Sequence, residues 1–268
     1  GIPIISVGNL IVGGSGKTPI TIELASKYEN VCVILRGYGR ASKGLQIVSL
    51  EGKILVDVKT SGDEAMLLAG SLPKATIIVC EDRIKAILKA KELGCKIIFL
   101  DDGFSKYKIA KFNILIRPKD EPTNIFCLPS GGYREPKGFY AQADMELLEE
   151  KDFKRVINKK KDGKICELPS KILLVTAISK PKRLLDYLPK EIKMVSFSDH
   201  YTFTKEDISK IQNEYKEFSI VTTGKDFVKL KDFNIKNLYL MDLKIEISQN
   251  LDFSLMNQYI NSFVEKSK

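Results

Sequence analysis

The sequence lacks the features that mark membrane-spanning, disulfide-rich and cysteine-zinc proteins. No apolar run reaches the roughly 18 residues that a spanning helix needs, so no segment is expected to cross a bilayer. The five cysteines are scattered, odd in number and mostly within apolar segments, without CxxC spacing. This distribution excludes a disulfide framework and favours small core residues in a reduced, cytoplasmic protein.

The chain has a pronounced excess of positive charge. Its formal net charge of +9 favours an anionic partner, such as a phosphate or an acidic lipid surface. Residues 159–161 are all lysine, a run more typical of a solvated face. No nucleic-acid-binding module with interleaved aromatic residues is present, so nucleic acid is not an expected partner. With 268 residues, the chain is long enough for one large or two ordinary domains.

The first half alternates apolar segments with helical ones, a pattern typical of a parallel sheet covered by helices. Strands are expected at residues 3–8, 31–36, 75–80, 95–101 and 111–116, and helices near 18–28, 63–71 and 82–93. A looser alternation over 44–57 predicts a hairpin inserted at the edge of this sheet.

A change of composition near 150–168 predicts a two-stranded ribbon around a polar turn. After it, apolar strands recur at 172–178, 192–197, 218–223 and 237–242, with helices between them. The sequence therefore predicts a larger α/β domain, a two-stranded linker, a smaller α/β domain and a final helix that could pack on either domain. These parts are assigned to residues 1–152, 153–168, 169–252 and 253–268.

A glycine-rich loop lies between the first expected strand and the first helix: Gly13, Gly14, Ser15, Gly16, Lys17 and Thr18. Such a loop curls so that its N–H groups point at one anion, beside the positive end of the helix dipole. Lys17 can then reach the outer phosphates and the Thr18 hydroxyl can hold Mg²⁺. The usual loop has a further glycine where this chain has Ile11. A simple turn gives no reason for Lys-Thr at a helix start, so the loop predicts a nucleotide-phosphate site.

Three acidic residues, Asp63, Asp101 and Asp102, stand at the ends or starts of expected elements, where they could bind a metal or a proton. Asp101 and Asp102 end the strand at 95–101, where at least one of them can hold Mg²⁺ beside the phosphate loop, or cap an Asp-Gly turn. Asp63 stands at a helix start. It can serve as a cap there, or as a general base toward an incoming hydroxyl, and these roles do not exclude one another.

Basic residues and the single histidine also follow expected strands. Arg36 and Arg40 flank two glycines in one loop, and Arg134 lies in another glycine-led segment, an arrangement that favours phosphate recognition. His200 follows a strand end beside Asp199. It is either a structural or exposed histidine, or part of an active-site loop.

In this order, the motifs resemble the tetraacyldisaccharide 4′-kinase family, which phosphorylates a lipid A disaccharide precursor at the inner membrane. The matching segments span nearly the whole chain: residues 7–9, 16–19, 36–40, 62–64, 100–104, 128–129, 134–136, 197, 199–200, 221–223 and 225–226.

The resemblance implies two α/β/α domains, the larger a phosphate-loop kinase domain with a mostly parallel sheet, joined by a two-stranded linker. ATP·Mg²⁺ and the acylated disaccharide phospholipid would meet in the cleft, at the cytoplasmic face of the bacterial inner membrane. Asp63 would help to deprotonate the sugar 4′-hydroxyl, assisted by His200. The phosphate loop would hold ATP, and Thr18, Asp101 and Asp102 the metal. The positions implied to line the site or meet the substrate are Arg36, Arg83, Arg134 and Glu135.

The sequence departs from the family pattern at several places. Ser105 and Lys106 replace the common Gln-His, and Gly224 replaces a more usual Glu. The family's N-terminal hydrophobic helix is not in this sequence, so membrane attachment is expected through the basic surface or through residues outside this sequence.

Two other functions fit the phosphate loop alone. A switch ATPase of the partition or metal-insertion type would hydrolyse ATP without a phosphorylated product. A regulatory module would bind nucleotide without turnover, and would lose only binding if Lys17 were replaced by alanine.

Overall fold

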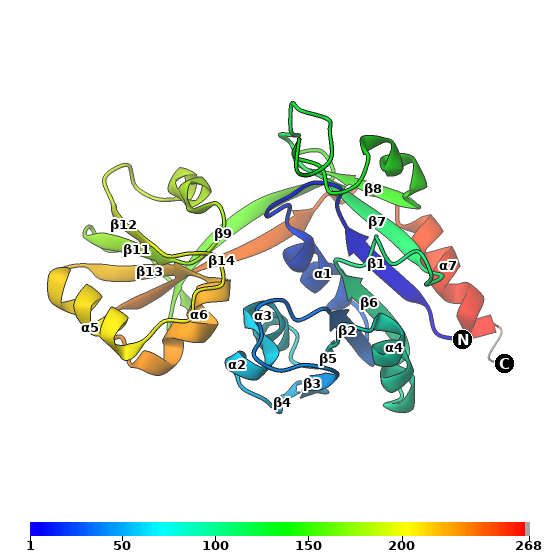
Figure 1. Cartoon of the computed structure of the whole chain (residues 1–268), viewed down its shortest axis with the longest axis horizontal. Coiled ribbons are helices and arrows are strands. Elements are labelled where there is room, and N and C mark those ends of the chain that lie inside the picture. Colours follow the sequence, from blue (N-terminus) through cyan, green and yellow to red (C-terminus); the bar gives the residue numbers. More distant parts are fainter. Residues whose placement is uncertain (266–268) are drawn as a thin grey trace. The chain divides into compact units, whose positions relative to one another are not determined.

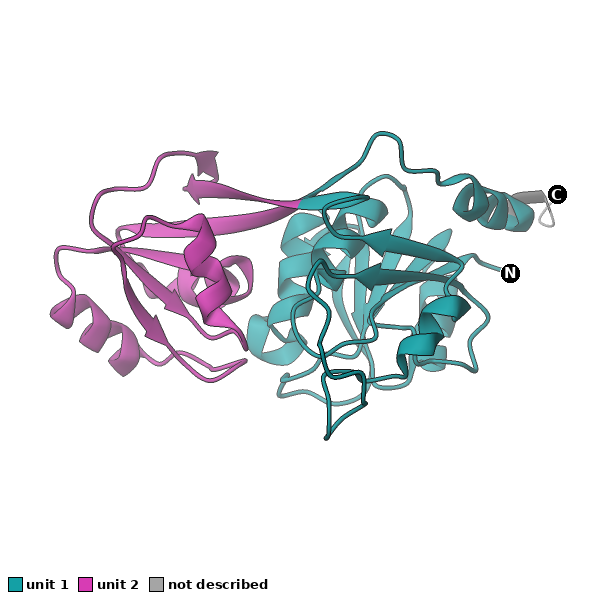
Figure 2. Cartoon of the chain, turned by 90° about the horizontal axis from the view of Figure 1, so that it is seen from above, with its two compact units in different colours: residues 1–154, 245–268 teal, residues 155–244 magenta. Residues whose placement is uncertain are grey.

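The computed structural model describes residues 1–265 and divides the chain into two compact units (Figure 2). Unit 1 comprises residues 1–154 and the C-terminal segment from Ile245, and unit 2 comprises Arg155–Lys244. The chain enters unit 2 within β9 (Phe153–Lys161) and returns within β14 (Leu238–Ile247), two neighbouring strands of one sheet. The sequence analysis had placed both linker strands within 153–168.

Unit 1 is built on a sheet with the strand order β4-β3-β5-β2-β6-β1-β7-β8 (Figure 1). The strands are β1 (Ile4–Gly8), β2 (Val31–Leu35), β3 (Gln46–Leu50), β4 (Lys53–Ile54), β5 (Thr76–Val79), β6 (Ile97–Asp101), β7 (Phe112–Arg117) and β8 (Met145–Leu148). β3 and β4 form the predicted antiparallel edge hairpin, and the other strands run parallel. The sequence analysis missed β8, a short edge strand that is only partly buried.

Successive residues of the parallel strands face two separate hydrophobic cores. Ile5 lies in the core covered by α1 (Lys17–Ala25), α3 (Asp63–Ser71) and α7 (Ser254–Glu265), whereas Ile4 lies in the core covered by α4 (Arg83–Glu92). The result is the predicted three-layer arrangement, with one-turn α2 (Val58–Ser61) leading into α3. The final helix packs on unit 1 through Met256, and residues 266–268 of the predicted helix lie outside the described residues.

Unit 2 has the strand order β10-β9-β14-β13-β11-β12. β11 (Ile172–Thr176), β12 (Lys193–Ser196), β13 (Ser219–Thr223) and β14 run parallel, and β10 (Lys164–Ile165) pairs antiparallel with β9. One face packs against α5 (Lys205–Glu214) and α6 (Gly224–Leu230). The other packs against the 3₁₀ segment η2 (Pro181–Tyr187). Further 3₁₀ segments are η1 (Lys137–Gln142) and η3 (Lys231–Phe233). The predicted α/β class with mostly parallel sheets is confirmed.

The topology of unit 1 determines where its polar loops gather. β1 lies between β6 and β7, with Val7 paired to Asp101. Because these strands are parallel, the loops that follow them lie side by side at the carboxyl edge of the sheet.

Candidate functional site

The glycine-rich loop after β1 has the backbone shape of an anion cradle. Gly13 and Gly16 have φ of 102° and 92°, values that L side chains rarely adopt. The Ser15 N–H donates to the Gly13 carbonyl at 2.8 Å. Helix α1 begins without a side-chain cap and without an acid in its first turn, so its N–H groups remain open to an anion. The buried Ser15 Oγ has no hydrogen-bond partner in the described chain, which fits a bound phosphate oxygen.

Ile11, the departure from the usual loop sequence, has a structural explanation. Its backbone forms an antiparallel bridge with Tyr133, and the Val12 N–H donates to the Gly132 carbonyl at 3.0 Å. Ile11 is buried in a small core with Phe104 and Tyr133. The first half of the loop is therefore held like a strand against residues 132–133, which removes the need for glycine there.

Asp101 lies at the end of β6, directly beside the start of α1. The Thr18 hydroxyl donates to Asp101 Oδ2 at 2.8 Å, and Thr21 Oγ1 lies 3.4 Å from Oδ1. Burial and the charge of Glu64 raise the pKa of Asp101 to about 7, against the hydrogen bond from Thr18 and the charge of Lys17. Asp101 therefore lies beside the phosphate loop, as expected for a strand-end acid, and it places a carboxylate next to the Thr18 hydroxyl. Its role toward a metal stays a prediction.

Asp102 has a different set of contacts. It has φ of 56° and its N–H donates to the Val7 carbonyl at 2.9 Å, which turns the side chain toward Arg134. Arg134 donates two hydrogen bonds to the carboxylate, at 2.8 and 2.7 Å, and Lys17 Nζ lies 3.9 Å away. Burial raises the pKa of Asp102, but the Arg134 hydrogen bonds and the nearby cations outweigh it, so the net pKa is lowered.

Asn9 connects the two cations of this site, a role that the sequence analysis did not assign. Its Oδ1 accepts from Lys17 Nζ at 3.1 Å and from Arg134 at 2.7 Å, while Nδ2 donates to the Ile11 carbonyl at 2.9 Å. Burial lowers the pKa of Lys17, partly offset by the Asp102 charge. The signal was available in the sequence, because an amide directly before a phosphate loop can orient the loop lysine.

Arg36 and Arg83 belong to the same edge of the sheet. Arg83 begins α4, is buried, and donates to the Cys80 carbonyl at 2.5 Å. Burial lowers its pKa, and the charges of Asp102 and Asp101 oppose that effect, while Arg36, which follows β2, adds to it. The structure thus places Arg83 within the electrostatic reach of the acid pair, and Arg36 within that of Arg83.

Asp63 is the first residue of α3 and is buried, with its Oδ1 accepting from the Glu64 N–H at 2.8 Å. The N-cap of α3 is Gly62, without a side-chain cap, so Asp63 is an acid of the first turn and not the cap that the sequence allowed. The charge of Glu64 raises the pKa of both Lys17 and Asp101, so the start of α3 lies within electrostatic reach of the phosphate loop. The role of general base stays a prediction.

Glu135 lines a small hollow next to the loop, of about 80 Å³. Its other lining residues are Asn9, Asp102, Phe104, Ser105 and Arg134. The Glu135 carboxylate also raises the pKa of Tyr107, after burial, through its charge and a hydrogen bond. Ser105, at one of the departures from the family pattern, is therefore part of the site wall.

His200 lies in unit 2, on the loop after β12. It has φ of 59°, and its N–H donates to the Ala177 carbonyl at 3.1 Å. The buried Asp226 fixes this region, because Oδ2 accepts from Thr176 Oγ1 at 2.7 Å and from the Ala177 N–H at 3.0 Å. The sequence analysis assigned no role to Asp226. The structure gives His200 a defined backbone position, and its catalytic role stays a prediction.

Comparison with known proteins identifies the source of these motifs. The family model for tetraacyldisaccharide-1-phosphate 4′-kinase (LpxK) matches residues 1–260. The chain belongs to this family. A tetraacyldisaccharide 4′-kinase of Aliarcobacter butzleri is 76% identical over 98% of this chain and 83% of its own length. That of Helicobacter acinonychis is 47% identical over 100% of this chain and 83% of its own length.

A solved member of the 4′-kinase family has the same fold. The crystal structure of LpxK from Aquifex aeolicus in complex with ATP superposes with a TM-score of 0.76 at 29% identity, covering 97% of this chain and 88% of that one. The resemblance inferred from the motifs is confirmed, and the chain is a kinase.

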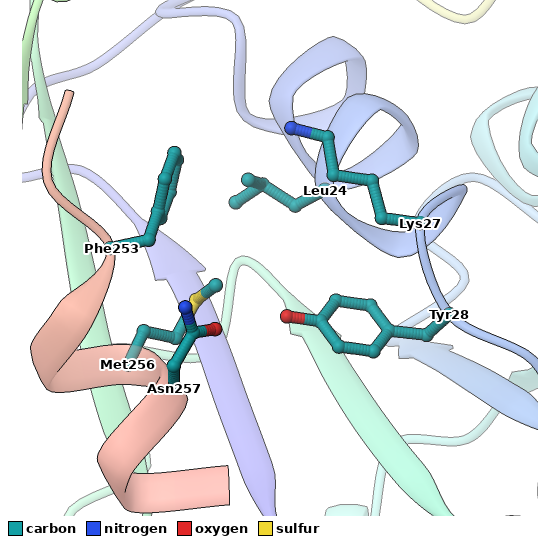
Figure 3. A pocket seen from close by; sticks show the side chains of 6 residues that line it. All are labelled: Leu24, Lys27, Tyr28, Phe253, Met256 and Asn257. Carbon is teal, nitrogen blue, oxygen red and sulfur yellow. The ribbon is translucent and has the colours of Figure 1, made fainter. Parts of the chain in front are cut away.

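A larger hollow in this 4′-kinase lies away from the phosphate loop. It measures about 170 Å³ and opens between α1 and α7 (Figure 3). Leu24, Tyr28, Phe253 and Met256 give it apolar walls, with Lys27 and Asn257 at its rim. Leu24 stands near the C-terminal end of α1, whereas the phosphate loop precedes its N-terminal end. The larger hollow is therefore separate from the nucleotide site.

Within residues 1–265, no helix combines the length and hydrophobicity that crossing a bilayer requires. The same residues contain no group of three or more His, Cys, Asp or Glu side chains arranged to hold a metal ion.

Proposed function

We propose that this kinase transfers the γ-phosphoryl group of ATP to the 4′-hydroxyl of a tetraacyldisaccharide 1-phosphate, a step of lipid A biosynthesis. The observation that carries the proposal is the joint arrangement of an anion-cradling loop, the Thr18–Asp101 pair and the Lys17–Asn9–Arg134 network at one sheet edge. The ATP-bound relative of the same fold supports ATP as the phosphoryl donor.

The residues of unit 1 supply the two things that phosphoryl transfer needs, alignment and charge neutralisation. The loop N–H groups hold the phosphates, and Lys17 and Arg134 neutralise charge that develops on the transferred group. The acceptor substrate is bound by residues that include Arg36, Arg83 and Glu135. In this proposal Asp63 accepts the proton of the attacking hydroxyl, and His200 assists that step.

The donor set at the loop fits Mg²⁺, which prefers oxygen ligands and keeps several waters. Thr18 and Asp101 would hold it, with Asp102 nearby. Bound there, Mg²⁺ would neutralise charge on the phosphates. The enzyme would work at the cytoplasmic face of the inner membrane, where an acylated substrate resides.

The test is an incubation of the protein with Mg-ATP and tetraacyldisaccharide 1-phosphate in detergent micelles, followed by mass spectrometry of the lipid. We expect a gain of one phosphate, and its loss in Lys17→Ala. ATP hydrolysis without phosphorylated lipid would instead indicate a switch ATPase.

Asp63→Ala tests the assignment of the base. We expect turnover to fall by about 10²-fold or more while ATP affinity changes little, because the carboxylate acts on the acceptor hydroxyl. Equal losses of turnover and of ATP affinity would contradict the role of base.

A further inference from the structure

The segment between β7 and β8 exposes three large apolar side chains close to the nucleotide site. Ile125, Phe126 and Leu128 are 60%, 67% and 57% exposed. Both views show this part of the chain projecting from unit 1 (Figure 1 and Figure 2). Single exposed apolar residues are ordinary, but three within four positions indicate an interaction surface. We refer to residues 124–130 as the apolar loop.

The apolar loop has a built conformation. Asn124 closes it, since Nδ2 donates to the Ser130 carbonyl at 2.8 Å and Oδ1 accepts from the Phe126 N–H at 3.0 Å. The Leu128 N–H donates to the Tyr133 carbonyl at 2.8 Å. At Gly131, a Cβ would lie 2.0 Å from the Phe126 carbonyl oxygen, so only glycine fits. The side chains are therefore held outward by the backbone.

The apolar loop is also fixed to the catalytic machinery. Residues 132–133, which follow it, pair with the first half of the phosphate loop at Ile11 and Val12. The next residue, Arg134, binds Asp102. Whatever the apolar loop contacts is consequently held at a set distance from the phosphates.

A basic and aromatic segment shares the small core beneath the apolar loop. Phe104 packs in that core together with Tyr133, and Cys127 of the loop packs against it. Tyr107 is 56% exposed and meets Phe139 edge-on, with 6.4 Å between ring centroids. Residues 105–111 contain three lysines and no acidic residue. Apolar tips beside tyrosine and lysine have the composition of a surface that meets anionic lipid headgroups.

We propose that the apolar loop inserts into the surface of an anionic phospholipid bilayer, with Lys106, Tyr107 and Lys108 at headgroup level. The inference rests on the proposed function, because an enzyme with a tetraacyl substrate must meet that substrate at a membrane. Insertion would hold the phosphate loop next to the headgroup layer, where the disaccharide lies.

The chain contains no tryptophan, so Phe126→Trp introduces a single tryptophan in the apolar loop, whose emission can be excited selectively. We would add vesicles of phosphatidylethanolamine and phosphatidylglycerol that contain no disaccharide lipid. The expected result is a blue shift of the emission and quenching by brominated acyl chains. The matched control is Leu255→Trp, at a 62% exposed position on α7, which should show neither effect.

A second set of variants measures binding directly. Replacing Ile125, Phe126 and Leu128 together by serine should lower vesicle partitioning by about tenfold or more, with ATP affinity unchanged. In the control variant, serine replaces three other exposed apolar residues, Ile84, Leu88 and Leu255. This variant should bind vesicles like the parent protein.

Two results would overturn the inference. One is a Phe126→Trp emission that vesicles leave unchanged. The other is an emission that responds only to tetraacyldisaccharide dispersed in detergent, which would assign the loop to substrate acyl chains. Because the vesicles carry no substrate, these results are independent of the kinase assay. Vesicle binding without lipid phosphorylation would instead reject the proposed function alone.

Discussion

Asp101 and Asp102 are adjacent in sequence and differ sharply in environment. Asp101, the last residue of β6, is buried against α1 and accepts a hydrogen bond from the Thr18 hydroxyl. Asp102 instead points toward Arg134, which donates two hydrogen bonds to its carboxylate. The difference arises because Asp101 still has strand geometry and Asp102 has φ of 56°. Two adjacent residues therefore have different functions available to them: Asp101 is placed to bind a metal, and Asp102 positions Arg134 and Lys17.

The raised pKa of Asp101 predicts a pH-dependent stability in the metal-free enzyme. The folded state keeps this proton up to a pKa of about 7, while the unfolded chain releases it near the ordinary value of 3.8. The folded state thus binds more protons in this window and loses stability as pH rises through it. On raising the pH from 4 to 8, the parent should lose this part of its free energy of unfolding and Asp101→Asn should not. The stability of the variant relative to the parent should therefore increase by on the order of 2–4 kcal/mol.

Denaturant unfolding in EDTA at both pH values would measure this gain. A difference between Asp101→Asn and parent that is the same at pH 4 and pH 8 would show that Asp101 titrates normally. Mg²⁺-dependent turnover should fall in the same variant.

The Arg134–Asp102 pair predicts a measurable coupling. A double-mutant cycle with Arg134→Ala and Asp102→Ala should give a coupling energy of about 1 kcal/mol, because the contact is bidentate and partly shielded. The exposed Lys89–Glu92 pair, at 2.9 Å on one helix, is the control and should give only about 0.3 kcal/mol. Equal coupling energies would mean that Asn9, which accepts from Arg134 through its carbonyl and Oδ1, holds the arginine in place without the carboxylate.

At the scale of elements, the start of α3 depends on one glycine. Gly62 has φ of 86° and ψ of 157°, a conformation available essentially to glycine alone. A Cβ there would lie 3.2 Å from the Tyr38 carbonyl oxygen, in the arginine-containing loop after β2. The loop and the first turn of α3, which carries Asp63, are thus packed together.

Gly62→Ala should therefore destabilise the protein by about 1–3 kcal/mol and lower turnover by displacing Asp63. Gly70→Ala, in the same helix with open space around the new Cβ, is the control and should stabilise by about 0.5–1 kcal/mol. Thermal unfolding and kinase assays of both variants measure the effect. A neutral Gly62→Ala would show that this helix start tolerates rearrangement.

At the scale of the whole molecule, the two units differ in what they contribute. The phosphate loop, the acid pair and the arginines all belong to unit 1, and His200 belongs to unit 2. We expect His200→Ala to lower kcat by about 10–100-fold with the Kd for ATP unchanged, because its proposed role concerns the acceptor hydroxyl and not the nucleotide. Separate measurements of nucleotide binding and turnover decide this. Unchanged kinetics would assign His200 a structural role, with Asp226 shaping its loop.

Much of the fold could be predicted because its signals are local. Continuous apolar runs predict the parallel strands, and the helices expected near 18–28, 63–71 and 82–93 correspond to α1, α3 and α4. β8 escaped prediction because it is a short edge strand whose pairing with β7 is the main evidence for it. The return strand β14 gave no sign that its last residues join unit 1, since that depends on the partner strand β9.

The chain by itself determined the family, the phosphate loop and the candidate residues, because backbone freedom at glycine and the chemistry of lysine, threonine and aspartate are properties of residue type and spacing. Only the tertiary structure decided which groups meet. It joined Asn9 to Lys17 and Arg134, explained Ile11 by its pairing with Tyr133, and separated the environments of Asp101 and Asp102. The contacts of Asn9 with Arg134 and of Ile11 with Tyr133 join segments over a hundred residues apart, and they depend on strand order and burial, which no local pattern encodes.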